Sequence, residues 1–332
     1  MIDIGHPDVS FAMNAVRQAA ALAQQIQAEI VTPALTKDDK SPVTIADFSS
    51  QAVVAGLLSK YFSGDALIAE ESSAVLLSPV QSDSLHQIVR YVNRVVEGVD
   101  DDQVCRWIDR GTEGTKDRNW ALDPIDGTKG FLRGDQYVVA LALIEKGVVQ
   151  LGVLGCPNLT DGQKTDFAGP GSLVIAHRGR GTWVTTLHGE GKFIRLNVST
   201  EAEYAQARIL RSFEDSHTNA GQIDRIAHLL HTTSEPVRMD SQAKYAMLAS
   251  GQGDLSLRML SPDRSNYREK IWDQAAGSII VEEAGGRITD LDGKSFDFSH
   301  GRTLACNRGV LASNGFLHEA ALRAVKVAES YE

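Results

Sequence analysis

Cysteine is scarce in this sequence, and its spacing makes two kinds of stabilising site unexpected. The three cysteines, Cys105, Cys156 and Cys306, are odd in number, lie far apart and form no CxxC pair. We therefore expect neither a disulfide framework nor a cysteine-based zinc site. The pattern is typical of a protein from a reducing compartment, and we expect the cytoplasm.

Long apolar runs and excess positive charge are also missing. No apolar run approaches the roughly 18 residues that span a bilayer, and residues 1–8 lack a signal-peptide or transit-peptide pattern. We therefore predict no membrane association. The 33 lysine and arginine residues face 43 acidic residues, which gives a net charge of −10. This sign disfavours binding to a nucleic-acid backbone, so no nucleic acid is expected as a partner.

The most informative segment that is present is WALDPIDGTKGF, residues 120–131. It places Asp123 and Asp126 on either side of a Pro-Ile pair and follows them with Gly127 and Thr128. Proline favours an extended residue before it, so we expect a strand to end near Asp123. Glycine then permits a tight turn. Taken alone, the segment also fits a solvated acidic turn.

Three more acidic residues stand next to predicted apolar elements. Asp47 lies early in a helix that Ser41 is predicted to cap, and Glu70 follows a short predicted buried strand. Asp273 falls in the first turn of a helix predicted over residues 272–284. Each has an ordinary alternative explanation, because carboxylates complement helix N-termini and solvate strand ends.

Convergence of these five carboxylates would require cations. Several carboxylates within a few ångströms cannot all stay ionised, because desolvation and mutual repulsion raise their pKa values. Bound Mg²⁺ resolves that conflict and prefers oxygen ligands. None of the nine histidines lies beside these positions, so zinc is disfavoured.

The chain is predicted to fold as layered α/β and α+β halves. Helical spacing covers residues 7–29, and two apolar runs joined by a tight turn predict a hairpin from residue 137 to residue 154. The largely β-type middle argues against a simple doubly wound sheet. The Gly-Pro-Gly at 169–171 predicts a division into domains 1–170 and 171–332.

Taken together, these motifs resemble those of the metal-dependent, lithium-sensitive phosphomonoesterases that include inositol monophosphatase and fructose-1,6-bisphosphatase. The similarity is greatest to the 3′(2′),5′-bisphosphate nucleotidase branch. The segments that carry it are 41–47, 70–72, 120–134, 154–158, 240–245, 271–277 and 283–286. The resemblance implies an α+β or α/β layered sandwich of the inositol-phosphatase type, with αβαβα layers and two sub-domains.

The resemblance also implies roles for individual residues. The implied metal ligands are Glu70, Asp123, the carbonyl of Ile125, Asp126 and Asp273. Thr128 would work with Asp47 to orient and deprotonate the attacking water. We expect the backbone N–H groups of Gly127 and Thr128 to hold phosphate oxygens if a helix starts there. The first domain would then carry most metal ligands, and the second the last ligand, Asp273, and the substrate-binding residues.

Substrate contacts implied by the resemblance are His217, Ser241, Lys244, Arg258 and Asp273. Lys244 and Arg258 also fit ordinary solvated cations. The sequence departs from the family at Ser216-His217-Thr218-Asn219, which lacks the second histidine of an H-x-x-H pattern. It also has Ala69 where a glycine often precedes the acidic pair.

The implied activity is Mg²⁺-dependent hydrolysis of the 3′-phosphate of adenosine 3′,5′-bisphosphate to AMP, with two or three ions bound. Action on 3′-phosphoadenosine 5′-phosphosulfate and inhibition by Li⁺ are also implied. Two alternatives stay open. An inositol polyphosphate 1-phosphatase would share the metal ligands, and a non-catalytic nucleotide or metal sensor would lack the Thr128–Asp47 pair. We expect a monomer whose partner is the small nucleotide bisphosphate substrate.

Overall fold

The computed structural model describes residues 2–29, 35–36, 42–77, 81–213, 220–260 and 266–330.

The first of two mixed sheets contains seven strands. The strands are β3 (Ala66–Ala69), β4 (Arg118–Asp126), β5 (Val138–Glu145), β6 (Val148–Cys156), β9 (Ser172–His177), β10 (Gly181–Thr186) and β11 (Ile194–Leu196). Their order is β11-β10-β9-β6-β5-β4-β3. β3 runs parallel to β4, and the other neighbours are antiparallel.

The second sheet contains five strands. They are β12 (Ile209–Arg211), β13 (Val237–Arg238), β14 (Leu255–Arg258), β15 (Arg287–Thr289) and β16 (Val310–Ser313), in the order β13-β12-β14-β16-β15. β12 is parallel to β13 and β14, whereas β16 is antiparallel to both of its neighbours. Two short hairpins pair β1 (Leu35–Thr36) with β2 (Pro42–Val43) and β7 (Leu159–Thr160) with β8 (Lys164–Thr165).

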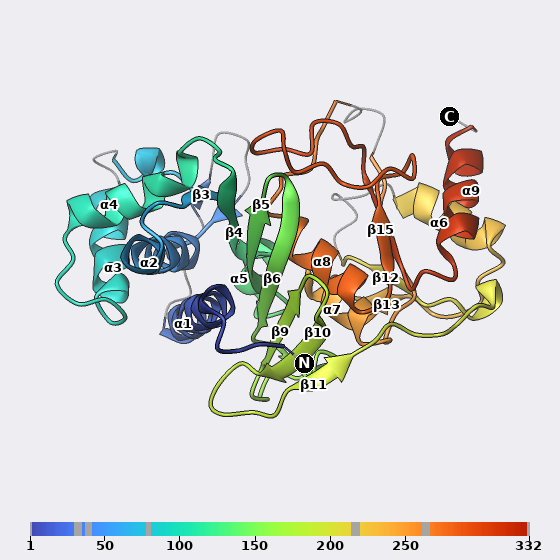
Figure 1. Cartoon of the computed structure of the whole chain (residues 1–332), viewed down its shortest axis with the longest axis horizontal. Helices are drawn as coiled ribbons and strands as arrows, with labels where there is room; N and C mark the ends of the chain where they lie inside the picture. Colours follow the sequence, from blue (N-terminus) through green and yellow to red (C-terminus); the bar gives the residue numbers. More distant parts are fainter. Residues whose placement is uncertain are drawn as a thin grey trace.

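Helices lie on both faces of each sheet and produce five layers (Figure 1). The outer helices α1 (Pro7–Glu29) and α2 (Ile45–Tyr61) cover the first sheet, and α3 (Ser82–Val92) and α4 (Asp101–Asp109) pack against α2. Between the sheets lie α7 (Ala243–Ala249) and α8 (Ala275–Glu283). α6 (Ala220–Leu229) and α9 (His318–Glu329) form the far layer. The predicted αβαβα sandwich is therefore confirmed.

Side-chain alternation along the central strands builds two of the three apolar cores. In β5, Val139 and Leu141 face the core under α1 and α2, whereas Ala140 and Ala142 face the core around α7 and α8. Both faces are buried because helices cover both, so the strand has a nearly continuous apolar sequence. A third core joins the second sheet to α6 and α9.

The predicted division near residue 170 does not coincide with the boundary between the two sheets. Strands β9, β10 and β11 follow residue 170 in the sequence but hydrogen-bond into the first sheet. The chain passes to the second sheet between Leu196 and Ile209. The division into domains 1–170 and 171–332 itself remains a prediction.

Two helices begin at other residues than predicted. Each difference changes the position of an acidic residue relative to the start of its helix. α2 begins at Ile45 and is capped by Thr44, whose side chain accepts from the backbone N–H of Asp47. The predicted cap, Ser41, lies outside the described residues. α8 begins at Ala275, so Asp273 lies in the turn before the helix and not in its first turn.

A buried histidine makes fold stability depend on pH. His318 is fully buried and shares hydrogen bonds with Thr289 Oγ1 at 3.0 Å and Ser313 Oγ at 2.8 Å. Burial, with a smaller effect of Arg287, lowers the pKa of His318 from 6.5 to about 4. The unfolded chain therefore takes up this proton first as pH falls. We expect the free energy of unfolding to decrease between about pH 6.5 and pH 4.

The comparison that tests this prediction is between the parent and His318→Gln. Glutamine keeps a donor and an acceptor but does not titrate. Urea unfolding at several pH values should show that the parent has the larger free energy of unfolding at neutral pH. The difference in the free energy of unfolding between the two proteins should become smaller toward pH 4. A difference that is constant with pH would contradict the prediction.

Candidate functional site

The pairing of two parallel strands brings Glu70 next to Asp123. β3 and β4 pair with Ala69 opposite Leu122, so the next residue of each strand is acidic. The sequence predicted that β4 ends near Asp123, but the strand continues to Asp126. Its pairing with β5 is irregular between Asp123 and Asp126. Both carboxylates are therefore presented from one strand end.

Asp123 lies at the electrostatic centre of the acidic residues. Its side chain is almost completely buried. Burial raises its pKa well above the usual value, and repulsion by Glu70, Asp126, Asp273 and Asp47 raises it further. The structure thus brings all five predicted carboxylates into one electrostatic neighbourhood.

The pKa of Asp126 is raised less than that of Asp123, because polar groups compensate the charge of the Asp126 carboxylate. Burial raises the pKa of Asp126 from 3.8 to about 6, while hydrogen bonding from Gln242 and the charge of Lys244 oppose the change. The backbone N–H of Gln242 donates to Asp126 Oδ2 at 2.6 Å. Gln242 also donates to the carbonyl of Trp272 and accepts from Gly277 N. It therefore connects Asp126 to the turn that carries Asp273.

Asp47 and Thr128 approach each other from different elements. Asp47 is buried in the first turn of α2, and Thr128 begins α5 (Thr128–Arg133). Thr128 Oγ1 lies 3.4 Å from Asp47 Oδ1 and 3.2 Å from the carbonyl of Ile125. Asp47 Oδ2 accepts from Thr44 N at 2.8 Å and from Thr44 Oγ1 at 2.5 Å. The capping box thus leaves Oδ1 as the oxygen that faces Thr128.

Gly127 makes the turn between the acidic strand and α5. Its φ of 92° lies in the left-handed region, which favours glycine. A side chain there would also meet Ser241 Cβ at 3.1 Å and the carbonyl of Gln136 at 3.2 Å. α5 begins directly after this turn, as the phosphate-binding prediction requires.

Lys244 and Arg258 lie close enough to Asp126 for their charges to lower its pKa, and Ser241 precedes Gln242, whose backbone N–H donates to Asp126. Ser241 has a φ of 61°, an uncommon conformation for a residue other than glycine. Lys244 donates to Ser212 Oγ at 2.8 Å, and burial lowers its pKa even though Asp126 opposes this change. Arg258 forms an ion pair with Glu269 at 2.9 Å.

Asp273 interacts electrostatically both with Arg258 and with the other acidic residues. Burial raises the pKa of Asp273 well above its usual value, Arg258 opposes that change, and Glu269, Asp126 and Glu70 add to it. The remaining predicted contact, His217, lies outside the described residues.

Arg302 belongs to the same region but was not predicted from the sequence. Its guanidinium donates to the carbonyls of Ala69 and Gly111, each at 2.6 Å, and lies 4.6 Å from the centre of the Trp272 ring. Ala69 precedes Glu70, and Trp272 precedes Asp273. One side chain therefore contacts the residues that precede two predicted metal ligands, through the backbone of Ala69 and through the ring of Trp272. No local sequence pattern indicates this role, because arginine is common in loops.

The donor set of this region fits a hard cation. The candidate ligands are carboxylate oxygens and one carbonyl, the groups that Mg²⁺ prefers. The raised pKa values of Asp123 and Asp273 express burial and mutual repulsion, whose cost to the ionised forms a bound cation would offset. A tighter mixed trio, Asp297, His300 and Cys306, has ligand atoms within 4.8 Å of one another but lies mostly exposed in a loop. It contains none of the predicted ligands.

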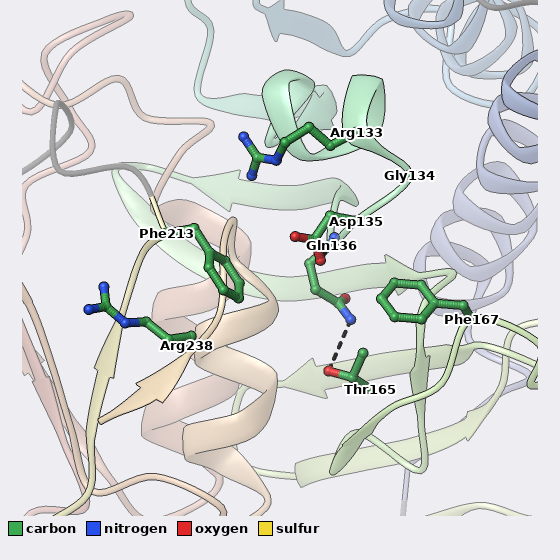
Figure 2. A pocket seen from close by; sticks show the side chains of 8 residues that line it. All are labelled: Arg133, Gly134, Asp135, Gln136, Thr165, Phe167, Phe213 and Arg238. Carbon is green, nitrogen blue, oxygen red and sulfur yellow. Dashed lines mark hydrogen bonds between the residues drawn. The ribbon is translucent and has the colours of Figure 1, made fainter. Parts of the chain in front are cut away.

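A separate cavity of about 550 Å³ opens near the C-terminal end of α5 (Figure 2). Its lining residues are Arg133, Gly134, Asp135, Gln136, Thr165, Phe167, Phe213 and Arg238. We call it the Phe167–Phe213 pocket. Figure 2 shows the two phenyl rings on opposite sides, with Gln136 between them. None of the predicted metal ligands lines it.

Comparison with known proteins defines the family. Residues 6–329 match the inositol monophosphatase family. The chain belongs to this family. Enzymes of the inositol monophosphatase family are phosphatases that generally depend on metal ions, so the chain is a phosphatase of this type.

Curated relatives within the inositol monophosphatase family are named as nucleotidases. The chain is 39% identical to a 3′(2′),5′-bisphosphate nucleotidase of Emericella nidulans, over 94% of this chain and 95% of the relative. It is 40% identical to a protein of the same name from Oryza sativa, over 96% of this chain and 93% of the relative. A similarly named protein of Arabidopsis thaliana is 40% identical, with 96% and 95% covered.

Solved structures of the same family share the fold. A Thermotoga maritima IMPase superimposes with a TM-score of 0.68 at 23% identity, covering 98% of each chain. CysQ from Bacteroides thetaiotaomicron superimposes with a TM-score of 0.61 at 20% identity, covering 92% of this chain and 96% of that one. Within the described ranges, no helix combines the length and apolar character needed to cross a bilayer.

Proposed function

We propose that this chain is a Mg²⁺-dependent 3′(2′),5′-bisphosphate nucleotidase that removes the 3′-phosphate of adenosine 3′,5′-bisphosphate to give AMP. The observation that carries the proposal is the identity of 38–40% to curated nucleotidases over at least 94% of this chain. The convergence of Asp47, Asp123, Asp126 and Asp273 with Thr128 supports the same chemistry. The substrate 3′-phosphoadenosine 5′-phosphosulfate differs only at the 5′ end, so we expect it to be used as well.

The proposed Mg²⁺ ligands are Glu70, Asp123, the carbonyl of Ile125, Asp126 and Asp273. Bound Mg²⁺ would offset the charge of the phosphate and make water a better nucleophile near neutral pH. We propose two or three ions, because four carboxylates and a carbonyl offer more oxygen ligands than one Mg²⁺, which keeps several waters in its octahedral shell, usually takes from a protein. The second position, near Asp126 and Asp273, is the one where we expect Li⁺ to compete.

Thr128 and Asp47 are proposed to deprotonate the attacking water. The hydroxyl of Thr128 lies within hydrogen-bond distance of two acceptors, Asp47 Oδ1 and the carbonyl of Ile125. With the Ile125 carbonyl bound to Mg²⁺, the hydroxyl would donate to Asp47 Oδ1 and leave a lone pair of Oγ1 to accept from water. Asp47 then receives the proton through Thr128. Thr44 fixes the other oxygen of Asp47, so the base is held in one orientation. The N–H groups of Gly127 and Thr128 would orient the phosphate.

Ser241, Lys244 and Arg258 are the proposed contacts to the remainder of the substrate, with His217 and Asp273. Lys244 and Arg258 supply positive charge beside Asp126 in a protein whose net charge is −10. This local charge suits a second phosphate. We propose that the protein works as a monomer.

Arg302 is expected to control Mg²⁺ affinity by holding two ligand segments together. Arg302→Lys keeps the charge but cannot donate to both carbonyls and stack on Trp272 in the same way. We expect Mg²⁺ affinity to fall by about 10-fold or more, as for groups that support metal ligands. Isothermal titration with Mg²⁺ measures this.

A matched control is Arg178→Lys. Arg178 also donates to a backbone carbonyl, that of Val149, and pairs with Glu282 outside the site. We expect it to leave Mg²⁺ affinity unchanged. Equal Mg²⁺ affinity in the Arg302 variant and the parent would contradict the assignment.

A substrate panel tests the proposed function against its alternatives. Phosphate release from adenosine 3′,5′-bisphosphate should greatly exceed release from inositol phosphates in the presence of Mg²⁺. The reverse order would favour an inositol polyphosphate 1-phosphatase. Absence of turnover on any phosphate monoester would favour a sensor, although the contact between Thr128 and Asp47 argues for catalysis.

A further inference from the structure

The loop between β15 and β16 gathers a second set of potential metal ligands. Asp297, His300 and Cys306 each offer one ligand atom, and these atoms lie within 4.8 Å of one another. His300 Nε2 is 3.1 Å from Asp297 Oδ2. Cysteine is among the most buried residue types, yet Cys306 is exposed beside an imidazole and a carboxylate. We call these three residues the loop trio.

Hydrogen bonds hold the two ends of the loop trio together. Asn307, which follows Cys306, is buried, and its Oδ1 accepts from the backbone N–H of Asp297 at 2.9 Å. Its Nδ2 donates to the carbonyl of Ser295 at 3.0 Å and to the buried Asp290 at 3.1 Å. These bonds fix the backbone at Asp297 relative to the backbone at Cys306.

The carboxylate of Asp297 is oriented toward the other two members of the trio. Its Oδ1 accepts from the backbone N–H of Ser299 at 3.0 Å and from Ser299 Oγ at 2.6 Å. Hydrogen bonding from Ser299 lowers the pKa of Asp297, so the carboxylate is ionised at neutral pH. Oδ2 is then the oxygen that faces His300.

The donor set of the loop trio suits a different ion from the one proposed at the acidic residues. A carboxylate, an imidazole and a thiolate are ligands of Zn²⁺, whereas Mg²⁺ takes oxygen ligands. Binding displaces the thiol proton of Cys306, so one thiolate and one carboxylate balance the charge of the ion. The three ligands leave one tetrahedral position for water. The sequence predicted no cysteine-based zinc site, because the trio is assembled by the fold and contains no CxxC pair.

The loop trio also lies on both sides of Arg302 in the sequence. Backbone hydrogen bonds join this part of the loop to the segment that leads to Asp273. The carbonyl of Arg302 accepts from Ile271 N at 3.1 Å, and Leu304 N donates to the carbonyl of Glu269 at 2.9 Å. An ion bound to the loop trio would therefore restrain the segment next to a proposed Mg²⁺ ligand.

We propose that the loop trio is a second metal site, which binds one Zn²⁺ or a similar thiophilic divalent cation and restrains the loop that carries Arg302. Mg²⁺ does not compete for this site, because soft thiolate ligands select other metals. The proposal goes beyond the phosphatase reaction and does not depend on which phosphate ester the protein hydrolyses.

Titration of the full chain with Co²⁺ in saturating Mg²⁺ tests the site. We expect one tetrahedral Co²⁺ per chain, with strong visible bands and a thiolate charge-transfer band in the near ultraviolet. Octahedral Co²⁺ among oxygen ligands absorbs weakly, so ions at the acidic residues do not give this spectrum. Cys306→Ser should abolish the charge-transfer band. His300→Gln should weaken Co²⁺ binding at least about 100-fold, more than loss of a group that only orients a ligand.

The matched controls are Cys105→Ser and His86→Gln. Cys105 is a partly exposed thiol outside the loop trio, and His86 is an exposed histidine whose Nε2 lies 3.6 Å from Asp101 Oδ2. Both variants should bind Co²⁺ as the parent does. Absence of the charge-transfer band in the parent, its persistence in Cys306→Ser, or one ion shared by two chains would each overturn the site. Because Cys306 and His300 are exposed, their variants should keep the parent melting temperature without metal.

Hydrogen exchange measures the restraint on the loop. Equimolar Zn²⁺, added in saturating Mg²⁺, should slow exchange of the Ile271 and Leu304 amides in the parent and leave it unchanged in Cys306→Ser. Unchanged exchange in the Zn²⁺-bound parent would overturn the proposed restraint. None of these measurements uses phosphate release, so failure of the metal site and failure of the proposed function are distinguishable.

Discussion

Asp123→Asn is expected to abolish phosphate release and, without metal, to raise the melting temperature of the protein. Asp123 is buried among carboxylates that raise its pKa, so its ionised form opposes folding at neutral pH. Asparagine removes the charge and keeps the oxygen that accepts from Ile125 N at 3.2 Å. Loss of a metal ligand should cost activity at least about 100-fold, more than loss of a group that only supports a ligand.

Thermal unfolding with EDTA and with Mg²⁺ measures both parts of this prediction. Mg²⁺ at 100 times its Kd should stabilise the parent by about 2.7 kcal/mol. The same Mg²⁺ concentration should stabilise the Asp123→Asn variant much less. Asp254→Asn is a control that should change the melting temperature in the opposite direction. Asp254 is buried in an ion pair with Arg208, so its replacement should lower the melting temperature in both conditions. A lower melting temperature for Asp123→Asn in EDTA would contradict the electrostatic account.

Burial of Asp126 fixes the direction of the metal-free pH dependence. The folded protein binds the Asp126 proton more tightly than the unfolded chain, because the pKa rises from 3.8 to about 6. This contribution to stability is present below pH 3.8 and is lost as pH rises through about 6. Saturating Mg²⁺ should remove this dependence.

Thr128→Val is expected to reduce kcat by a factor of about 10² to 10⁴, the usual contribution of general acid–base groups. Valine has nearly the same shape as threonine but cannot pass a proton from water to Asp47. Because the proposed metal ligands are intact, the stabilisation by Mg²⁺ should match the parent. This separates the variant from Asp123→Asn, which loses activity and metal response together.

Two further variants test the assignment of Thr128. Thr128→Ser restores the hydroxyl and should recover most of kcat. Asp47→Asn should reduce kcat by about the same factor as Thr128→Val. The double variant should reduce kcat by little more than either single change, since the two residues act as one unit. Additive losses in the double variant, or full activity of Thr128→Val, would contradict the proposed proton transfer.

The sequence predicted the elements with strong local signals. Apolar periodicity located α1, and two apolar runs around a tight turn located the hairpin of β5 and β6. Acidic residues next to apolar elements located Glu70, Asp123 and Asp126, because a strand end is visible in local sequence. The αβαβα layering followed from the family resemblance and is confirmed by the packing of α7 and α8 between two sheets.

The features that were missed or misplaced depend on contacts between distant segments. The start of α8 was predicted three residues early, because the turn before it is held by the carbonyl of Ile271 and by Gln242, and neither is a local capping signal. α4 was not predicted, since its apolar stripe is limited to a few residues of a polar segment. Arg302 and the Phe167–Phe213 pocket arise where separated loops meet, which sequence spacing does not encode.

The most direct test of the central claim is the ratio of kcat/KM for adenosine 3′,5′-bisphosphate to that for inositol 1,4-bisphosphate, measured with saturating Mg²⁺. Polar and aromatic contacts specific to one substrate can discriminate by several orders of magnitude. We expect a ratio of at least about 100 in favour of the nucleotide. A ratio near or below one would contradict it.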